Sequence, residues 1–226
     1  ATSVNAVGEG RTIYDNIRKA IYYLLSCNIG EIIAIFGAIL LGLGSPLTPI
    51  QILWLNLVTD GMPALALGIE PAEKDIMKRP PRKKNETVFA GGVGVRILYQ
   101  GVIIGLLALG AFWLALSWGK SLVEARTMAF LTIALSQLIH SFNARSLKQS
   151  IFSLGIFTNR YLLYGFSASL LLQLSVVFLP FFREIFGTTL LGREAWLWII
   201  GLSLVPFIVA EVDKLVNRIS NSQAGV

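Results

Sequence analysis

Six long apolar stretches constrain this chain more than any other feature, because each approaches the length that crosses a lipid bilayer. They cover Ala20–Leu43, Pro49–Ile69, Ile97–Trp118, Thr127–Phe142, Tyr161–Phe182 and Ala195–Val212. Only 14% of the residues are charged, and the mean hydropathy is +0.68. A soluble domain carries about 25% charged residues. We therefore predict an all-α, polytopic membrane bundle of six transmembrane helices.

The distribution of basic residues predicts the topology of that bundle. Lys and Arg gather in Arg11–Lys19, Lys74–Lys84, Arg145–Arg160 and Lys214–Arg218. With six spans, all four segments fall on one side of the membrane, and the opposite loops hold few basic residues. This is the positive-inside pattern, with both termini cytoplasmic. The net charge of +6 is therefore interpreted as a topology signal, and no nucleic-acid partner is expected beside the lipid bilayer.

Two connections add to this organisation. Gly42–Pro49 is a short Gly/Pro turn, so the first two spans should be adjacent and antiparallel. The cytoplasmic loop Glu70–Ala90 is too long for a bare turn and too short for a domain. We predict that this loop, residues 70–90, docks onto a cytoplasmic element. A solvated basic loop that only fixes topology is the alternative.

A polar cluster interrupts the second apolar stretch. Asn56, Thr59 and Asp60 lie at i, i+3 and i+4, which places an amide, a hydroxyl and a carboxylate on one face of an α-helix. An ionised carboxylate at membrane depth is costly unless something compensates it, so an ion or proton site is the default interpretation. Pro63 cannot bond the carbonyl of Thr59, which frees a further oxygen. Such hard oxygen donors suit Ca²⁺, Mg²⁺ or Na⁺.

The first and fourth spans carry similar groups. Asn28 and Glu31 share a helical face, and Gly30 between them allows a neighbouring helix to approach closely. We expect this face to meet the Asn56–Asp60 face near mid-membrane. Gln137 can add a neutral carbonyl oxygen, and His140, one turn further on, is expected to be structural. The predicted metal ligands are Asn28, Glu31, Asn56, Thr59, Asp60 and Gln137.

No nucleophile–base pair, Gly-rich phosphate loop or His/Cys metal cluster is found in the sequence, so no catalytic or cofactor-binding residue is predicted. The residues themselves point to cation transport through a membrane. Three classes stay open at this point: an ion pump, a secondary transporter or channel, and a mainly structural role for the last four spans. A secondary transporter usually shows an internal repeat, which this sequence lacks.

Several runs closely resemble P-type Ca²⁺-transporting ATPases of the sarco/endoplasmic-reticulum type (type IIA). They are Glu9–Asn16 (EGRTIYDN), Ser26–Glu31 (SCNIGE), Leu53–Pro71 (LWLNLVTDGMPALALGIEP) and Asp75–Arg82 (DIMKRPPR). The resemblance implies that the six spans, residues 1–226, form the C-terminal transmembrane domain of a translocase. It implies that this pump moves Ca²⁺ out of the cytoplasm and binds ATP and Mg²⁺ in domains that this sequence does not contain. Its partners are then the earlier spans and cytoplasmic domains of the same pump.

By position, the resemblance assigns the ligands. Asn28, Glu31, Thr59 and Asp60 match the family's first Ca²⁺ site, and Asn56 and Asp60 match its second. The rest of the second site would come from an earlier span. The loop after Glu70 matches one that touches the phosphorylation domain, which supports a coupling role for residues 70–90.

One position departs from the two-site pumps, in which a glutamate matches Gln137. A missing mid-membrane charge is costly for a dication, so we expect one high-affinity Ca²⁺ per cycle, or a second Ca²⁺ that binds much more weakly. Burial of Glu31 and Asp60 further predicts H⁺ countertransport after Ca²⁺ leaves. A P-type pump for Na⁺/K⁺ or Mn²⁺ remains the alternative. We expect a multi-pass protein of the cell membrane rather than the endoplasmic reticulum.

Overall fold

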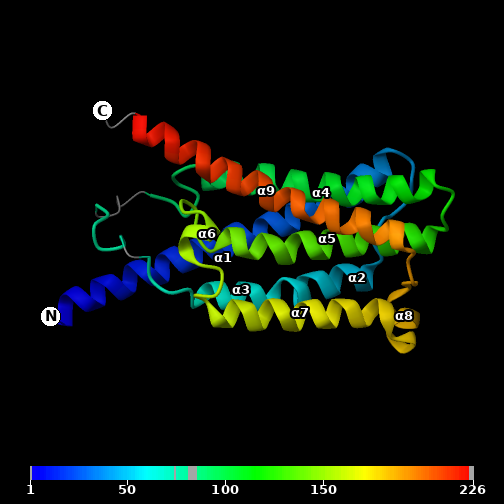
Figure 1. The fold of residues 1–226 in the computed structure, drawn as a ribbon, viewed down its shortest axis with the longest axis horizontal. Coiled ribbons are helices and arrows are strands. Elements are labelled where there is room, and N and C mark those ends of the chain that lie inside the picture. The colour runs from blue at the N-terminus through cyan, green and yellow to red at the C-terminus, as the bar shows by residue number, and fades with distance from the viewer. Residues whose placement is uncertain (1, 74, 81–85, 224–226) are drawn as a thin grey trace.

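The structure, a computed structural model, describes residues 2–73, 75–80 and 86–223 and is a bundle of long helices (Figure 1). Its elements are α1 (Thr2–Leu40), α2 (Pro49–Trp54), the π-helix η1 (Leu55–Thr59), α3 (Gly61–Gly68), α4 (Val93–Ser117), α5 (Leu122–Ala144), α6 (Ile151–Leu154), α7 (Arg160–Phe178), α8 (Pro180–Phe186) and α9 (Arg193–Gln223). No strand occurs among the described residues.

Six helical segments of the described chain are long and apolar enough to cross a membrane, which confirms the predicted fold class. They are Val4–Leu40, Pro49–Gly68, Val93–Ser117, Leu122–Ala144, Arg160–Phe178 and Arg193–Ile219. The beginning of α1 and the end of α9 lie at the same end of the bundle, here called the terminal end (Figure 1). This arrangement agrees with an even number of crossings.

Several helices continue beyond the apolar stretches that predict the spans. The span predicted to begin at Ala20 belongs to α1, which begins at Thr2, and the last span continues in α9 to Gln223. α5 begins at Leu122, five residues before the predicted start, because Ser121 and Glu124 form a capping box there. Hydropathy marks the lipid-facing part of a helix, whereas capping and backbone hydrogen bonding set where the helix ends.

The fifth apolar stretch, Tyr161–Phe182, extends four residues past the end of its helix, because α7 ends at Phe178. Leu179 is extended, with φ −87° and ψ 125°, as expected for a residue that precedes a proline. Pro180 then begins the short helix α8, which ends at Phe186 and is followed by Gly187 in the left-handed conformation. The chain thus turns over at the end of the bundle opposite the terminal end (Figure 1).

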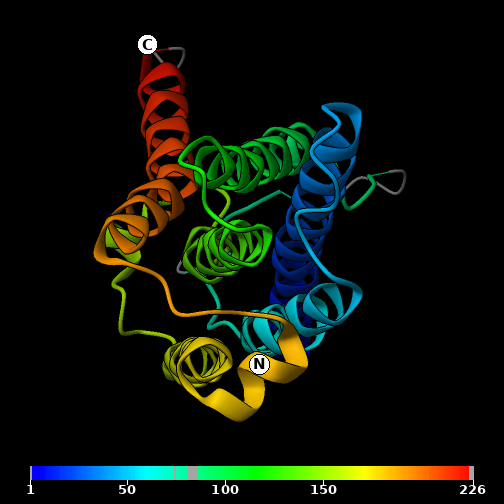
Figure 2. The same ribbon diagram turned by 90° about the vertical axis from the view of Figure 1, so that its right-hand side faces the viewer.

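α5 lies at the centre of the bundle, with the other long helices around it (Figure 2). Of the six candidate spans it has the largest buried share, and Phe130, Leu131, Ile133 and Leu138 are fully buried. Interior placement explains why this helix can carry many polar residues: they face protein rather than lipid.

Glycines allow α1 and α4 to pack closely. A Cβ atom at Gly105 of α4 would lie 2.6 Å from the carbonyl oxygen of Gly30, and one at Gly30 would lie 2.9 Å from Ile104 Cγ2. The prediction that Gly30 permits a close helix approach is therefore confirmed, with α4 as the neighbour. This contact fixes α1 at the level of Glu31, the next residue.

Candidate cation site

The second span changes its winding at the candidate ligands. A π-turn covers Leu55–Thr59, and the Asp60 N–H donates to Leu55 O at 2.9 Å instead of to the carbonyl four residues back. The expectation of one continuous α-helical face was therefore wrong, because the π-turn shifts Asp60 relative to Asn56. Ser169 of α7 donates to the Val58 carbonyl at 2.8 Å, so a neighbouring helix bonds the altered backbone. π-Turns of this kind occur frequently at functional sites.

Glu31 of α1 joins two other helices. Its side chain lies between η1 and α5, and the residue is only 4% exposed. Asn56 Nδ2 donates to Glu31 Oε2 at 2.9 Å, and Gln137 Nε2 donates to Glu31 Oε1 at 3.0 Å. The structure therefore brings together Glu31, Asn56 and Gln137, three predicted ligands from three different spans.

Asp60 lies deeper than Glu31 and is 1% exposed. The Tyr23 hydroxyl donates to Asp60 Oδ1 at 3.1 Å, and the Cys27 thiol is a second neighbour. The buried oxygens Asp60 Oδ2, Thr59 Oγ1 and Gln137 Oε1 have no hydrogen-bond partner among the described residues. Buried oxygens of this kind are normally paired, so the cluster holds three oxygen atoms with unused capacity to bind a cation.

Two of the predicted ligands are less enclosed. Asn56 is exposed and Asn28 is half-buried, although both lie on helices that carry a buried carboxylate. Asn28 makes no side-chain hydrogen bond to any described residue, and no group of three or more His, Cys, Asp or Glu side chains forms in the described ranges. The cluster is thus closed toward α5 and open on the side of Asn56.

A comparison among buried carboxylates sets this cluster apart. Five acidic residues of the described chain are buried: Glu31, Asp60, Glu70, Glu73 and Glu211. The last three form ion pairs with Arg145, Lys19 and Lys214, at 2.7, 3.2 and 2.9 Å. Glu31 and Asp60 have only neutral partners. A buried charge without a counter-charge is unfavourable, so this pair requires a cation or protons.

Sequence reasoning missed Tyr23 and Cys27 as neighbours of the site. A signal for them was available, because Tyr23, Cys27 and Glu31 follow one another at intervals of four and therefore share one ridge of α1. His140 is fully buried and packs against the rings of Tyr22 and Tyr23, with centroids 5.1 and 6.1 Å away. These ring contacts agree with the structural role expected for His140.

The loop that follows α3 is fastened to the first half of α1. Residue 74 and residues 81–85 of the predicted coupling loop lie outside the described residues. In the remainder, Arg11 donates to the carbonyls of Ile76 and Arg79 at 3.0 and 2.8 Å, and Arg18 donates to those of Val88 and Ala90. The loop therefore docks onto α1 itself.

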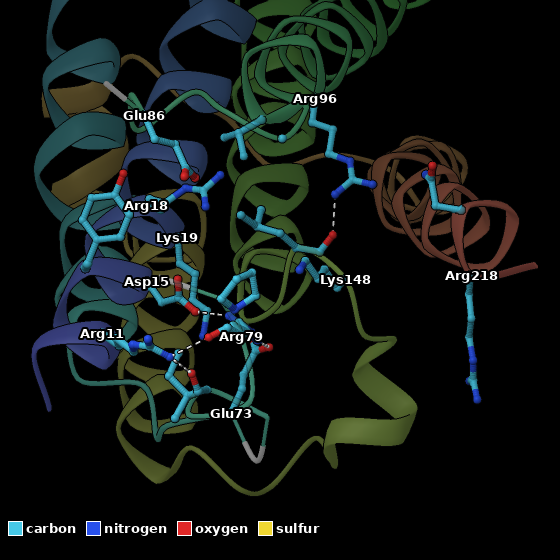
Figure 3. Close-up of a pocket in the computed structure, with 17 residues that line it drawn as sticks. Arg11, Asp15, Arg18, Lys19, Glu73, Arg79, Glu86, Arg96, Lys148 and Arg218 are labelled. Atoms are coloured by element: carbon cyan, nitrogen blue, oxygen red, sulfur yellow. Dashed lines mark hydrogen bonds and ion pairs between the residues drawn. The ribbon is translucent and has the colours of Figure 1, made fainter. Parts of the chain in front are cut away.

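A basic pocket of about 790 Å³ lies beside this junction. Side chains of α1 line one side, and Arg96 of α4 and Arg218 of α9 come from the other (Figure 3). Arg79 forms ion pairs with Asp15, Glu73 and Asp75. Its hydrogen bonds to Asp75 and the nearby charges of Glu73 and Asp15 raise the pKa of the Arg79 guanidinium above its usual value, although desolvation acts in the opposite direction. Four of the basic side chains that line the pocket thus hold the loop against α1: Arg11, Arg18, Lys19 and Arg79.

Together, fold and site define a polytopic helical membrane domain with two buried, uncompensated carboxylates among amide and hydroxyl oxygens. The chain belongs to the cation-transporting ATPase family: residues 44–216 match the description "Cation transporting ATPase, C-terminus". The predicted resemblance to the C-terminal part of P-type Ca²⁺-ATPases is confirmed by this match and by curated relatives.

Three of these relatives are calcium-transporting ATPases by name. "Calcium-transporting ATPase 1" of Bacillus cereus is 45% identical over 95% of this chain, and "Calcium-transporting ATPase" of Bacillus subtilis is 46% identical over 93%. "Calcium-transporting ATPase type 2C member 1" of Homo sapiens is 33% identical over 96%. The matches cover 26%, 24% and 24% of these relatives, so the chain spans about a quarter of their length.

Proposed function

We propose that this chain is the membrane part of an ATP-driven Ca²⁺ pump that binds Ca²⁺ between α1, η1, α3 and α5. The observation that carries the proposal is the pair of buried carboxylates, Glu31 and Asp60, whose partners are all neutral. A dication would supply the missing positive charge. Unpaired oxygens of Thr59, Asp60 and Gln137 supply the hard donors that Ca²⁺ prefers.

The full ligand set remains the one predicted from the sequence: Asn28, Glu31, Asn56, Thr59, Asp60 and Gln137. Exposure of Asn56 supports the idea that a further span of the intact pump closes the cage. The terminal end would face the cytoplasm, where ATP and Mg²⁺ bind in other domains. The loop of residues 70–90, attached to α1, would couple those domains to the site. Bacterial relatives support a location in the cell membrane.

The test uses the intact pump reconstituted in vesicles, with ATP hydrolysis measured as a function of Ca²⁺ concentration. A charge of +2 and a charge of −1 that lie about 4 Å apart attract each other by about 8 kcal/mol at an effective dielectric constant of about 20. Desolvation of the two charges offsets part of this attraction. We expect Glu31→Gln and Asp60→Asn each to weaken Ca²⁺ activation at least about 100-fold. Competition by Mn²⁺, Na⁺ and K⁺ in the same assay identifies the preferred cation.

The matched control is Glu124→Gln. Glu124 lies at the end of α5 far from the cluster, caps that helix with Ser121 and pairs with Lys120 at 3.7 Å. This variant should keep the wild-type Ca²⁺ dependence. If Glu31→Gln and Asp60→Asn behave like Glu124→Gln, the cation site lies elsewhere and the proposal is refuted.

Proton countertransport is the second part of the proposal. When Ca²⁺ leaves, Glu31 and Asp60 are left without a counter-charge, and protons can neutralise them in a low-dielectric interior. Protons would then leave the compartment that receives Ca²⁺. In sealed vesicles loaded with a pH-sensitive dye, ATP-driven Ca²⁺ uptake should make the interior alkaline. Uptake at constant interior pH, in vesicles shown to retain an imposed pH gradient, would argue against proton exchange.

A further inference from the structure

A buried ion pair marks the point where the site-bearing second span leaves the bundle. Glu70 follows the last turn of α3, and Arg145 follows the last residue of α5. They are 5% and 1% exposed. Arg145 Nε lies 2.9 Å from Glu70 Oε1 and 3.2 Å from Oε2, and Arg145 Nη2 lies 2.7 Å from Oε1. This fork geometry holds both side chains in a defined orientation.

The pair is embedded in hydrogen bonds from two more spans. Asn16 Nδ2 of α1 donates to the Glu70 carbonyl at 2.8 Å. Asn159, which caps α7, donates through Nδ2 to Glu70 Oε2 and, at 3.1 Å, to the Ala66 carbonyl. Arg145 Nη1 in turn donates to the Gly155 carbonyl at 2.9 Å. One buried centre therefore joins α1, α3, α5 and α7.

Those helices include the three that carry the candidate ligands. Gln137 precedes Arg145 by eight residues of α5, which corresponds to about 12 Å along a helix. Asp60 precedes Glu70 by ten residues, and Asn16 precedes Glu31 by fifteen on the continuous α1. Because packed helices are stiff, a bond that fixes their ends also fixes how far each slides past the next.

We propose that Glu70 and Arg145 form a positioning pair that sets the register of α3 against α1 and α5 and thereby the separation of Asp60 from Glu31 and Gln137. The inference rests on the proposed function. Glu73, three residues after Glu70, pairs with Lys19 of α1 at 3.2 Å with both side chains buried. A displacement of α1 is therefore transmitted to the end of α3 through Glu73 and Glu70. From Glu70 it is transmitted to α5 through Arg145.

The experiment compares variants of the intact pump in reconstituted vesicles, measuring both the Ca²⁺ concentration for half-maximal ATP hydrolysis and the maximal rate at saturating Ca²⁺. Glu70→Gln keeps the shape and removes the charge, Arg145→Gln removes the guanidinium fork, and Arg145→Lys keeps the charge without the fork. Glu124→Gln again serves as the matched control, because Glu124 is an acidic residue in the first turn of α5, outside the loop and the candidate cluster.

We expect the first two variants to raise the half-maximal Ca²⁺ concentration about tenfold, equal to about 1.4 kcal/mol, with a smaller change in the maximal rate. Arg145→Lys should fall between them and the wild type, and Glu124→Gln should match the wild type. If Arg145→Gln fails to fold, the near-isosteric Glu70→Gln carries the test. A purely structural pair would lower the amount of active pump and leave the half-maximal concentration unchanged, which would overturn the inference.

Failure of the proposed function gives a different result. If the wild-type pump hydrolyses ATP without any dependence on Ca²⁺, the proposed function is refuted and the positioning role falls with it. If the wild type depends on Ca²⁺ and Glu70→Gln shares its half-maximal concentration, the positioning role alone is refuted.

Discussion

Replacement of Gly105 by alanine tests the close packing that places Glu31. A Cβ atom at this position would lie 2.6 Å from Gly30 O, 2.6 Å from Ile33 Cβ and 2.8 Å from Ile33 Cγ2. Real Cβ atoms essentially never approach other heavy atoms this closely. The oxygen belongs to the backbone of α1 and cannot rotate away, so α1 and α4 must separate to accept the methyl group.

The size of the effect follows from two opposing contributions. Overpacking a tight interior costs about 1–3 kcal/mol, and a backbone contact that cannot relax belongs near the upper value. Alanine is favoured over glycine inside a helix by about 1 kcal/mol. The net loss in the free energy of unfolding should therefore be about 2 kcal/mol, which for a chain of this size lowers Tm by about 4–8 °C.

Thermal unfolding of the detergent-solubilised protein measures this loss, and Gly110→Ala provides the control. Gly110 lies on the same helix, but a Cβ atom there would have nothing within 4 Å. The Gly110→Ala variant should therefore keep the wild-type Tm or raise it slightly. If Gly105→Ala is as stable as Gly110→Ala, the helices are not held at the distance described and the reasoning fails. In the intact pump, Gly105→Ala should also weaken Ca²⁺ activation, because Glu31 follows Gly30.

Three further outcomes are expected. Gln137→Glu adds a carboxylate beside Glu31, where the Gln137 amide now donates at 3.0 Å, and should raise the Ca²⁺ transported per ATP from one toward two; an unchanged ratio in radioactive-calcium uptake would argue against the single-site prediction. Arg18→Gln removes the donor to two loop carbonyls and should speed tryptic cleavage of the 70–90 loop severalfold, whereas an unaltered cleavage rate would mean that Arg18 does not anchor it. Trp54→Phe deletes the 3.0 Å hydrogen bond to Gln173 and should cost about 1 kcal/mol in thermal unfolding; a wild-type Tm would contradict this.

Part of the candidate site could be predicted from the sequence, because polar residues at membrane depth are informative by their presence alone. Asn56, Thr59, Asp60, Glu31 and Gln137 stand out in this way. The expected meeting of the Glu31 face with the Asn56–Asp60 face corresponds to the bond from Asn56 to Glu31. The bond from Gln137 to Glu31 could not be assigned, since it joins residues 106 positions apart. The carboxylates' lack of a cationic partner also required the packed structure.

The local backbone geometry of the helices was the second feature that could not be predicted fully from the sequence. A hydrophobic pattern is compatible with either an α-helix or a short π-turn, so the insertion at Leu55–Thr59 left no signal in composition. Pro180, by contrast, is a local breaker with a known effect on the residue before it, and the end of α7 could have been read from it. Glu70 and Arg145 appeared as ordinary charges flanking apolar stretches.

The sequence by itself determined that this chain crosses a membrane as helices, because the hydrophobic lengths and the absence of water in the bilayer interior leave few other folds. It also determined which side chains are available to hold a cation. Only the tertiary structure decided which of these meet, since contact depends on how closely α1 and α4 approach at their glycines and on where η1 turns Asp60. It also decided that Glu70 is neutralised by Arg145 whereas Glu31 and Asp60 have only neutral partners.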